Sequence, residues 1–599
     1  MALYGLENYV GANNVFLHML SIIEKSPDEE ICRTYFQYCP TTMHRHHSVG
    51  LRKNYTTPCE AIKDIDIAIR EVFNLCPLVL IDLGSGRLCD AHERVRTFKL
   101  ETPFKKLVFE AATMKLDYPR IRQAVAKYFS WVMFSHTWEG KEPTFQDVNL
   151  VESVWKLDNS LLNEKLRQFC TTAREDGHRW AWSDTCCIDK TTSAVLSQSL
   201  TSMYSWYEEA AETLVYLADV LSLSELCDLT KSRWMTRAWT LQELLASGVI
   251  RFYTRDWKPY LNDMHRNHKD SPTIRQELAH AMGVTPDMIT SFRPEDLGVR
   301  EKLRLASTRN ASLVEDIAYS LIGIFSSDIV PRYGLGKKAL GHLLENIVAR
   351  TGDVTVISWT GKSSPYNSAL PDSLAVYSQT PYSPPSAETN ELEAAVDRLH
   401  TGLATRDHAL AFFRRVIQLP RATFANRCLH LPCIVFPVTK VDVLELGDPQ
   451  ETLYRAVVPL LGKVEFRTMD ARQLCTSRKL VFIHPWLHDL RDPLDEFMFD
   501  AEQQFKPDDD EDKLGDSTNN SGGSVPATPS RVKPLAPVDL YRQALWLIVR
   551  LGRPFSTLLL EWQNNKQYKR VATDCEIIIS GVPCQTNPKD LRAKVLEIV

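Results

Sequence analysis

Short apolar runs alternate with helical patterns between residues 129 and 254 of this chain. The helical segments place apolar residues three or four positions apart, as a helix packed on one face requires. The apolar runs are nearly continuous, which is typical of strands buried in a parallel sheet. This alternation predicts an α/β fold with a mostly parallel sheet flanked by helices. The expected strands are 129–135, 179–183, 213–217 and 249–253, and the expected helices are 160–173, 193–210 and 239–247.

The first 128 residues follow a mixed, mostly helical pattern, with one apolar run over 77–81. That run leads into Asp82-Leu-Gly-Ser-Gly86, whose glycines resemble part of a nucleotide-binding turn. Arg87 and Leu88 stand where that fingerprint needs a further glycine and the start of a helix. We therefore predict a strand–turn–strand hairpin here.

The pattern changes again beyond the alternating region. Ser312-Leu-Val-Glu315 has the spacing of a capping box, before a helix that should turn Ile317, Leu321 and Phe325 inward. Residues 361–388 are rich in Pro, Ser and Tyr and are predicted to form a loop. From about residue 430 the pattern favours strands, with candidates at 433–438, 454–458, 479–483, 557–562 and 575–579 and with turn residues at 563–565.

A polar, acidic segment interrupts this strand-rich part. Residues 506–537 contain Asp508-Asp-Asp-Glu-Asp512 followed by Asn, Gly, Ser, Thr and Pro, a composition that cannot bury enough apolar surface to fold. The expected organisation is a mixed, mostly helical region at 1–128, an α/β domain with an extension at 129–330, a loop-rich then β-rich module at 331–505, a disordered insertion at 506–537, and the end of the β-rich module at 538–599.

Charge and composition narrow the class of protein. The net charge is −5 and no large basic block is present, which argues against nucleic acid as the main partner. The 14 cysteines are spread along the chain without zinc-ligand spacing, which favours reduced thiols. The N-terminus lacks a signal-peptide pattern, and the best apolar run, 544–551, contains Arg550. We expect a soluble, cytoplasmic protein without a membrane span.

Three polar motifs stand at ends of the expected strands and helices. They are Ser135-His-Thr-Trp138, Asp184-Thr-Cys-Cys-Ile-Asp189 and Arg237-Ala-Trp-Thr-Leu-Gln-Glu-Leu244. Ligands in open α/β sheets bind beyond the carboxyl ends of strands, so the first two motifs should meet at one edge. In the third, Glu243 stands in an otherwise apolar helical turn, where a carboxylate is costly unless it is paired or functional. The sequence therefore predicts one site centred on Glu243.

Taken in order, the three motifs resemble the blocks of the fungal heterokaryon-incompatibility (HET) domain, which run roughly Ser-His-x-Trp-Gly, Asp-x-x-Cys-Ile-Asp-Gln and Arg-x-Trp-Thr-Leu-Gln-Glu-Leu. This chain differs in Glu139, in the doubled Cys186-Cys187 and in Lys190. The resemblance implies a role in fungal non-self recognition and programmed cell death. It also implies a fold similar to Toll/interleukin receptor (TIR) domains, many of which cleave NAD with a Glu in a Trp-x-x-x-Glu-Leu helix.

Trp239 and Glu243 have that spacing, so the resemblance implies that Glu243 is the catalytic residue of an NAD glycohydrolase. A carboxylate beside the ribose would stabilise the positive charge that develops as the bond to nicotinamide breaks. NAD would be a substrate, and no cofactor or metal is implied. Self-association and an incompatibility partner protein are the expected partners. The implied substrate-binding residues are Ser135, His136, Trp138, Asp184, Arg237 and Trp239.

Other interpretations stay open from the sequence. Glu243 could pair with Arg237 on a solvated helix face, and His136 could bond a backbone carbonyl. A cysteine nucleophile at Cys186 or Cys187 would need exposure and a lowered pKa, which the apolar setting disfavours. The tryptophans at 180, 182, 206, 234, 239 and 257 are assigned to the core. The main alternative function is a non-enzymatic signalling module that triggers cell death by recruiting partners, and a further one is a HET-like fold without function.

Overall fold

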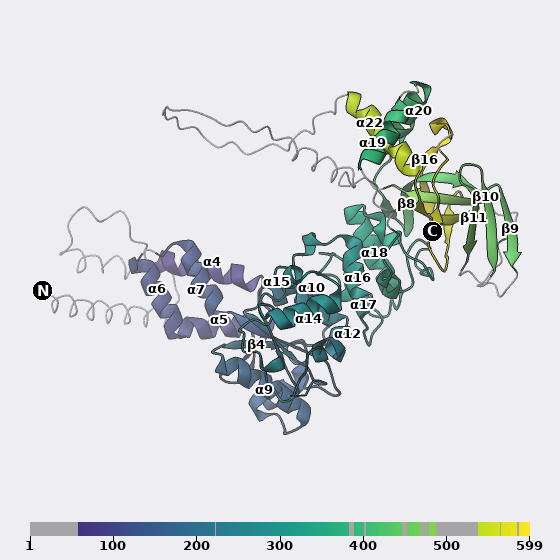
Figure 1. Cartoon of the computed structure of the whole chain (residues 1–599). Helices are drawn as coiled ribbons and strands as arrows, with labels where there is room; N and C mark the ends of the chain where they lie inside the picture. Colours follow the sequence, from purple (N-terminus) through teal and green to yellow (C-terminus); the bar gives the residue numbers. More distant parts are fainter. Residues whose placement is uncertain are drawn as a thin grey trace, which may run out of the picture.

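The computed structural model describes residues 58–599, apart from 115, 222, 383–388, 401–402, 446–451, 469–473, 475–478, 487–536, 564 and 584–585. The expectations for residues 1–57 and for the acidic insertion at 506–536 lie outside these residues. In Figure 1 the purple N-terminal helices lie at one end, the blue and teal α/β part in the middle, and the green and yellow strand-rich part at the other end.

A six-stranded sheet with the order β2-β1-β4-β3-β5-β6 forms the centre of the α/β part. Strands β3 to β6 are parallel to one another, while β1 pairs antiparallel with both β2 and β4. The α/β class, the four parallel strands and the hairpin are confirmed. The bounds are β1 (Val79–Asp82), β2 (Leu88–Asp90), β3 (Trp131–His136), β4 (Trp180–Ser183), β5 (Glu212–Tyr216) and β6 (Ile250–Tyr253).

The hairpin between β1 and β2 needs its glycine. Gly86 has a φ of 76°, and a Cβ at this position would lie 2.3 Å from Ser153 Oγ. Its carbonyl oxygen accepts the backbone N–H of Val154. The turn is therefore shaped by packing against the segment after α8 (Phe145–Val151), and the nucleotide-binding interpretation of Asp82–Gly86 finds no helix start here.

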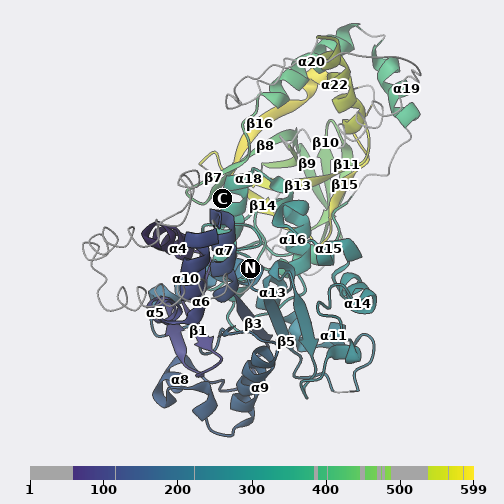
Figure 2. The ribbon, with the colours of Figure 1, turned by 90° about the vertical axis from the view of Figure 1, so that its left-hand side faces the viewer.

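Helices connect the strands and cover the sheet (Figures 1 and 2). Helix α9 begins after Ser160, whose hydroxyl accepts from Asn163 N, and Gly177 with a φ of 86° follows its end. The helices before β3 are α4 (Pro58–Phe73), α5 (Ala91–Leu100), α6 (Thr102–Met114) and α7 (Tyr118–Tyr128). Those between β3 and β6 are α8, η1 (Val154–Lys156), α9 (Leu161–Glu175), α10 (Ser193–Glu208), α11 (Asp228–Lys231), α12 (Arg233–Thr236) and α13 (Trp239–Ala246).

The segment after β6 differs from one expectation. The predicted capping box at 312–315 is wrong, because α17 begins at Asp316 and Glu315 makes no side-chain cap. Glu315 Oε1 instead accepts the backbone N–H groups of Gly334 and Gly336, each at 2.9 Å, a tertiary contact that local spacing does not reveal. The elements here are η2 (Tyr260–Asn262), α14 (Pro272–Met282), α15 (Pro286–Thr290), η3 (Pro294–Asp296), α16 (Val299–Ala306), α17 (Asp316–Tyr319), α18 (Lys338–Thr351), η4 (Val354–Ile357) and η5 (Leu374–Ser378).

Strands dominate the chain beyond residue 420, as the pattern indicated, and form two sheets. One has the order β12-β13-β14-β16-β8-β7, with β12 also paired to β8 and β15 to β13, and the other has the order β11-β10-β9. The bounds are β7 (Thr423–Ala425), β8 (Cys428–Pro437), β9 (Lys440–Glu445), β10 (Leu453–Val458), β11 (Gly462–Arg467), β12 (Leu480–Pro485), β13 (Phe555–Trp562), β14 (Tyr568–Val571), β15 (Ile577–Ile579) and β16 (Arg592–Ile598). The sequence pattern missed β7, β9, β11, β14 and β16.

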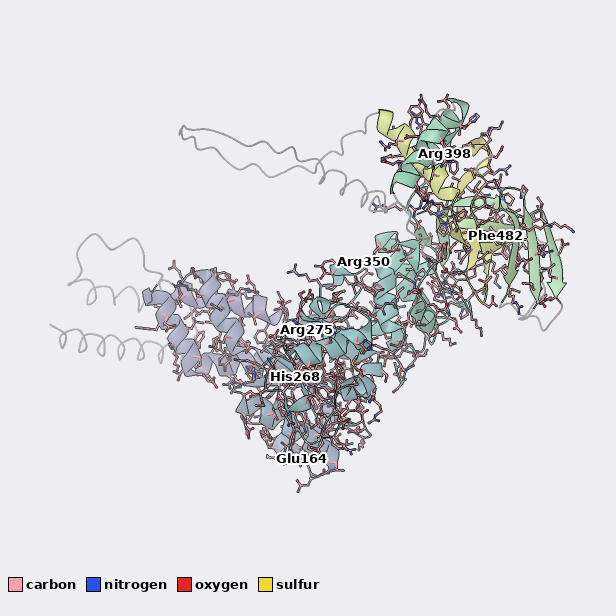
Figure 3. All side chains as sticks on the ribbon, viewed as in Figure 1. Glu164, His268, Arg275, Arg350, Arg398 and Phe482 are labelled. Carbon is pink, nitrogen blue, oxygen red and sulfur yellow. The ribbon has the colours of Figure 1, made fainter. Side chains whose placement is uncertain are left out.

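The strand-rich part has its own core and is also joined to the rest of the molecule. Its helices α19 (Thr389–His400), α20 (Leu403–Ile417) and α22 (Pro537–Leu551) pack on one another, and η6 (Pro588–Asp590) precedes β16. Phe482 belongs to this core, and Figure 3 marks its place in the strand-rich part. Buried Arg570 donates to Ile357 O at 2.8 Å and stacks on Trp359 at 3.7 Å, which ties β14 to the α/β side. No described helix is long and apolar enough to cross a membrane.

Candidate functional site

Ser135 and Glu243 meet at the carboxyl end of β3. Ser135 lies near the end of the strand, and its hydroxyl donates to Glu243 Oε2 from α13. The same hydroxyl oxygen accepts from the Trp234 indole N–H at 2.7 Å. All three residues are buried, and Glu243 is 8% exposed. The predicted meeting of the first and third motifs is therefore present in the fold, and Ser135 is the direct partner of the carboxylate.

The surroundings of the Glu243 carboxyl group shift its pKa toward neutral pH. Burial raises its pKa from 4.5 to about 7, because a charged carboxylate loses its water there. The hydrogen bond from Ser135 opposes this shift, Asp184 adds to it, and the positive charges of Arg237 and Arg309 also oppose it. A carboxyl group that titrates near neutral pH is characteristic of functional sites, although structural networks can produce the same shift.

The second motif reaches the same place through Asp184. This half-buried residue follows β4, and its charge acts on Glu243. Asp184 Oδ2 accepts the Trp138 indole N–H at 3.0 Å, and the Lys190 ammonium lies 3.8 Å from the centre of the Trp138 ring. Trp138 itself is 43% exposed. Trp138, Asp184 and Lys190 thus form a partly exposed rim beside the buried Ser135–Glu243 pair.

His136 is buried beside this rim with unused hydrogen-bonding atoms. Its ring stacks on Phe134 with centroids 4.3 Å apart. Among the described residues, neither ring nitrogen has a hydrogen-bond partner, so the bond to a backbone carbonyl considered above is not formed. Burial lowers the pKa of His136 well below its usual value, and Lys165, Arg237 and Lys190 lower it further, so the ring is neutral at pH 7. Unpartnered buried polar atoms are uncommon and call for an explanation such as a ligand.

Arg237 lies just before α13, and Trp239 begins this helix one turn before Glu243. Among the residues described, no ion pair joins Arg237 to Glu243, so the paired interpretation of Glu243 is not what the fold shows. Trp239 is half-buried and contacts Asp316 from α17. Burial raises the pKa of Asp316, while hydrogen bonds from Tyr333 and Trp239 lower it. The segment after residue 310 therefore packs directly on the site.

Sequence reasoning missed three neighbours of Glu243. Trp234 lies in the core as expected, and its indole N–H also donates to Ser135 Oγ, which the sequence did not indicate. Arg309 is buried and donates to Arg237 O at 3.0 Å and to Thr240 Oγ1 at 2.9 Å, and its charge acts on Glu243. The Tyr207 hydroxyl donates to Phe134 O at 3.3 Å, and burial and Glu243 together raise its pKa. Tyr207 stands among the apolar positions of its helix, so the pattern did not mark it as a site residue. Arg309 is 66 positions from Glu243 in the sequence, too far for local spacing to connect the two.

Other candidate chemistries find less support in the geometry. Cys186 and Cys187 are free thiols but buried, and burial raises the pKa of Cys187 well above its usual value, the opposite of a nucleophile. Asp189 accepts from Thr191 N at 3.0 Å and so holds the loop that follows β4. Within the described part of the chain, no group of three or more His, Cys, Asp or Glu residues is arranged to hold a metal ion. Two cavities of about 590 and 400 Å³ are lined by residues other than Glu243.

Comparison with known proteins agrees with the first two motifs. Residues 131–227 match the family model described as Heterokaryon incompatibility protein (HET). The chain carries a HET domain. Vegetative incompatibility protein HET-E-1 of Podospora anserina is 34% identical over 228 residues, which is 36% of this chain and only 16% of that relative. No solved structure matches the chain significantly. The family match includes Ser135, His136, Trp138 and Asp184, whereas Arg237, Trp239 and Glu243 lie beyond it.

Proposed function

We propose that this chain acts in heterokaryon incompatibility, as an effector that triggers programmed cell death through its HET domain. The proposal is carried by the match of residues 131–227 to the HET family together with the likeness to HET-E-1, a vegetative incompatibility protein. The match to that relative is partial, so the activity, substrates and partners of the present chain form part of the proposal.

For its chemistry we propose hydrolysis of NAD at the bond between nicotinamide and ribose, in a TIR-like arrangement. The C–N bond breaks with its electron pair leaving on nicotinamide, water attacks the ribose carbon, and the products are nicotinamide, ADP-ribose and a proton. Ionised Glu243 would stabilise the cationic ribose. His136, with two free ring nitrogens, could bond a ribose hydroxyl or phosphate, and the Trp138–Asp184 rim could receive a flat ring.

The enclosed state of Glu243 bears on when this reaction would occur. The carboxyl group is engaged by Ser135 and is little exposed. Substrate access therefore requires movement of the rim or of the segment around Asp316, which packs on Trp239. We propose that self-association supplies this opening, so that the monomer turns over NAD slowly and concentrated or clustered protein turns it over faster.

NAD loss and nicotinamide release, followed over a protein concentration series, test the chemistry. Wild type is compared with Glu243→Gln and with Glu277→Gln. Glu277 is a matched control because it is another buried glutamate, which accepts from the Tyr260 hydroxyl at 3.0 Å outside the site. We expect wild type and Glu277→Gln to consume NAD at similar rates. Glu243→Gln should consume it at least about 100-fold more slowly. Equal NAD turnover in wild type and Glu243→Gln would exclude this chemistry.

A non-enzymatic signalling role is the second candidate, and one observation favours it. Glu243 already has a hydrogen-bond partner in Ser135 and is almost enclosed, as a structural carboxyl group would be. Expression of the same variants in a filamentous fungus separates the two functions. If Glu243→Gln still arrests growth while folding normally, the HET domain acts by recruiting partners. If it loses killing while Glu277→Gln keeps it, the enzymatic proposal stands.

A further inference from the structure

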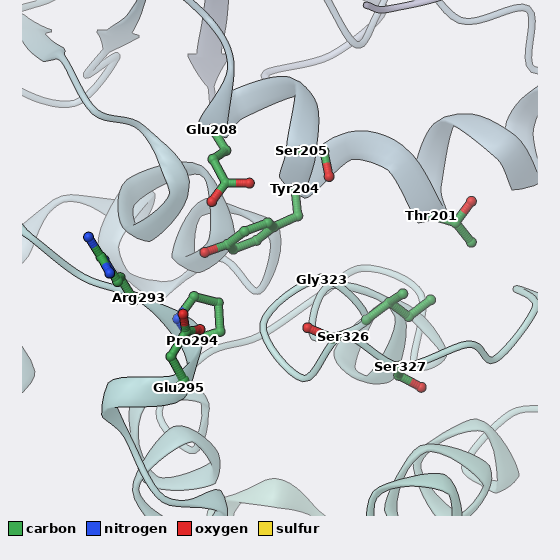
Figure 4. A pocket seen from close by; sticks show the side chains of 11 residues that line it. Thr201, Tyr204, Ser205, Glu208, Arg293, Pro294, Glu295, Gly323, Ser326 and Ser327 are labelled. Atoms are coloured by element: carbon green, nitrogen blue, oxygen red, sulfur yellow. The ribbon is translucent and has the colours of Figure 1, made fainter. Parts of the chain in front are cut away.

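A cavity beside α10, lined by residues other than Glu243, has the chemistry of a ligand site. Its volume is about 590 Å³, enough for a molecule of one or two sugar rings. Helix α10 forms one wall, η3 and its neighbour Arg293 form a second, and the turn after α17 forms a third (Figure 4). Its polar lining is rich in hydroxyl groups. The lining residues are Thr201, Tyr204, Ser205, Glu208, Arg293, Pro294, Glu295, Ile322, Gly323, Ser326 and Ser327.

Two carboxylates in this cavity form no ion pair with the described residues, and the charge of Lys302 acts on one of them, Glu295. Glu208, the last residue of α10, and Glu295 on η3 are exposed, and among the described residues neither forms an ion pair or a side-chain hydrogen bond. Burial raises the pKa of Glu208, and the negative charges of Glu209 and Glu295 raise it further. The carboxyl end of α10 adds a partial negative charge at the same wall.

Tyr204 contributes a hydroxyl group to the cavity from a largely buried residue. The residue is only 7% exposed and lines the cavity, and its hydroxyl group has no hydrogen-bond partner among the described residues. Burial raises the pKa of this hydroxyl, and so do Glu208 and Glu295, which places the three groups within electrostatic reach of one another. Figure 4 shows Tyr204 and Glu208 facing Pro294 and Glu295 across the cavity.

Close packing holds Tyr204 in this position. A Cβ atom on Gly323 would lie 2.1 Å from Tyr204 Cβ, so only glycine allows the turn after α17 to approach the tyrosine. Ser327 is fixed by its bond to Asn346 at 2.8 Å. The walls are thus preformed, as in most small-molecule sites. Arg293 stands at the rim with a positive charge, which the ligand must accommodate through its neutral groups.

We propose that this cavity binds a small hydroxylated ammonium compound of the amino-sugar class. The ammonium group would lie between Glu208 and Glu295, and the sugar hydroxyls would bond Tyr204, Ser205 and Ser326. Carboxylates that form no ion pair with the described residues favour a positively charged ligand, and hydroxyl side chains favour a ligand with hydroxyl groups. This site does not include Glu243, so the proposal stands independently of the NAD chemistry.

Calorimetric titration of the full chain with glucosamine tests the proposal. Two further probes separate its parts: N-acetylglucosamine keeps the sugar hydroxyls without the charge, and spermidine carries charge without hydroxyls. We expect saturable binding of glucosamine, weakened about tenfold or more in both other compounds, since a hydrogen bond to a charged group contributes about 1.5–3 kcal/mol. Equal binding of N-acetylglucosamine would overturn the ammonium site, and equal binding of spermidine would overturn the sugar assignment.

Variants locate the binding on the cavity. Glu208→Gln and Glu295→Gln should each weaken glucosamine binding about tenfold. Glu209→Gln is the matched control, because Glu209 is the exposed neighbour of Glu208 and does not line the cavity. An unchanged affinity in Glu208→Gln and Glu295→Gln, or an equal loss in Glu209→Gln, would show that the cavity is not the site. Absence of saturable glucosamine binding to wild type would also reject the proposal.

Discussion

Ser135 donates a hydrogen bond to Glu243 across 108 positions of the chain, and the serine hydroxyl is held in turn by the Trp234 indole. This pair joins the carboxyl end of β3 to α13 in a buried place. The hydrogen bond favours the ionised form of Glu243, and burial favours the neutral form. Because burial is the larger effect, the carboxyl group can change its charge near neutral pH.

Glu243→Gln should stabilise the protein at pH 8. The pKa of the Glu243 carboxyl group is about 7 in the folded protein and near 4.5 in the unfolded chain, so the folded state binds the proton more tightly. The stability contributed by this group is therefore complete below pH 4.5 and is lost as the pH rises through 7. At 1.36 kcal/mol per pKa unit the loss is about 3 kcal/mol, and glutamine does not share it. Urea unfolding of both proteins at pH 5 and pH 8 checks this.

The informative quantity is the change with pH in the stability difference between the two proteins. Other titrating groups cancel in that difference. A difference that stays constant from pH 5 to pH 8 would show that Glu243 is ionised throughout this range in the folded protein. The outcome does not depend on catalysis, so it can be measured whatever the function.

Ser135→Ala should raise the pKa of Glu243 further. The hydrogen bond from Ser135 to the carboxylate lowers the pKa of Glu243 and so opposes the effect of burial, and alanine cannot donate this bond. The fall in stability with rising pH should then be centred above pH 7, and NAD turnover, which needs the ionised form, should rise at a correspondingly higher pH. Ser183→Ala is the control, since Ser183 is equally buried at the end of β4 and bonds Thr185 instead. A midpoint that moves equally in both variants, or not at all, contradicts the role of Ser135.

Breaking the buried ion pair between Lys165 and Glu142, next to the loop that carries Trp138, should lower the free energy of unfolding. Lys165 on α9 lies 2.5 Å from Glu142 and also donates to Thr137 O at 3.3 Å. Lys165→Met leaves an unpaired buried carboxylate, for which we expect a loss of about 3–5 kcal/mol at pH 7. Adding Glu142→Gln should recover much of that loss. A double variant that is no more stable than Lys165→Met would show that the two charges act independently. Chemical denaturation of the single and double variants measures it.

Gly323→Ala should destabilise the protein by about 1–3 kcal/mol, because the new methyl group must displace Tyr204. Gly248→Ala is the matched variant. Nothing lies within 4 Å of a Cβ at Gly248, so its stability should change by less than about 1 kcal/mol. Thermal unfolding of both variants tests the difference. Similar stabilities would mean that the turn after α17 can move away from Tyr204 at little cost.

The sequence by itself determined the elements of the α/β part. Runs of apolar residues long enough for a buried strand, separated by helical periodicity, leave few other ways to bury that surface, and β3 to β6 lie where the pattern put them. It also determined the three motifs, of which the first two lie in the segment that matches the HET family. The sequence pattern did not predict edge strands such as β7 and β9. β7 is only three residues long and β9 is mostly exposed, so neither carries much apolar pattern.

Tertiary structure alone decided how the candidate site is closed. Local spacing cannot show that Ser135 would meet Glu243, that Arg309 would come back to the same place, or that Glu315 would bond two glycine N–H groups rather than cap a helix. These contacts join residues far apart in the chain, and each is chosen because a buried polar group must find a partner wherever the packed fold offers one. Only the packed chain reveals how far Glu243 is enclosed and that Tyr204 lines a cavity beside α10.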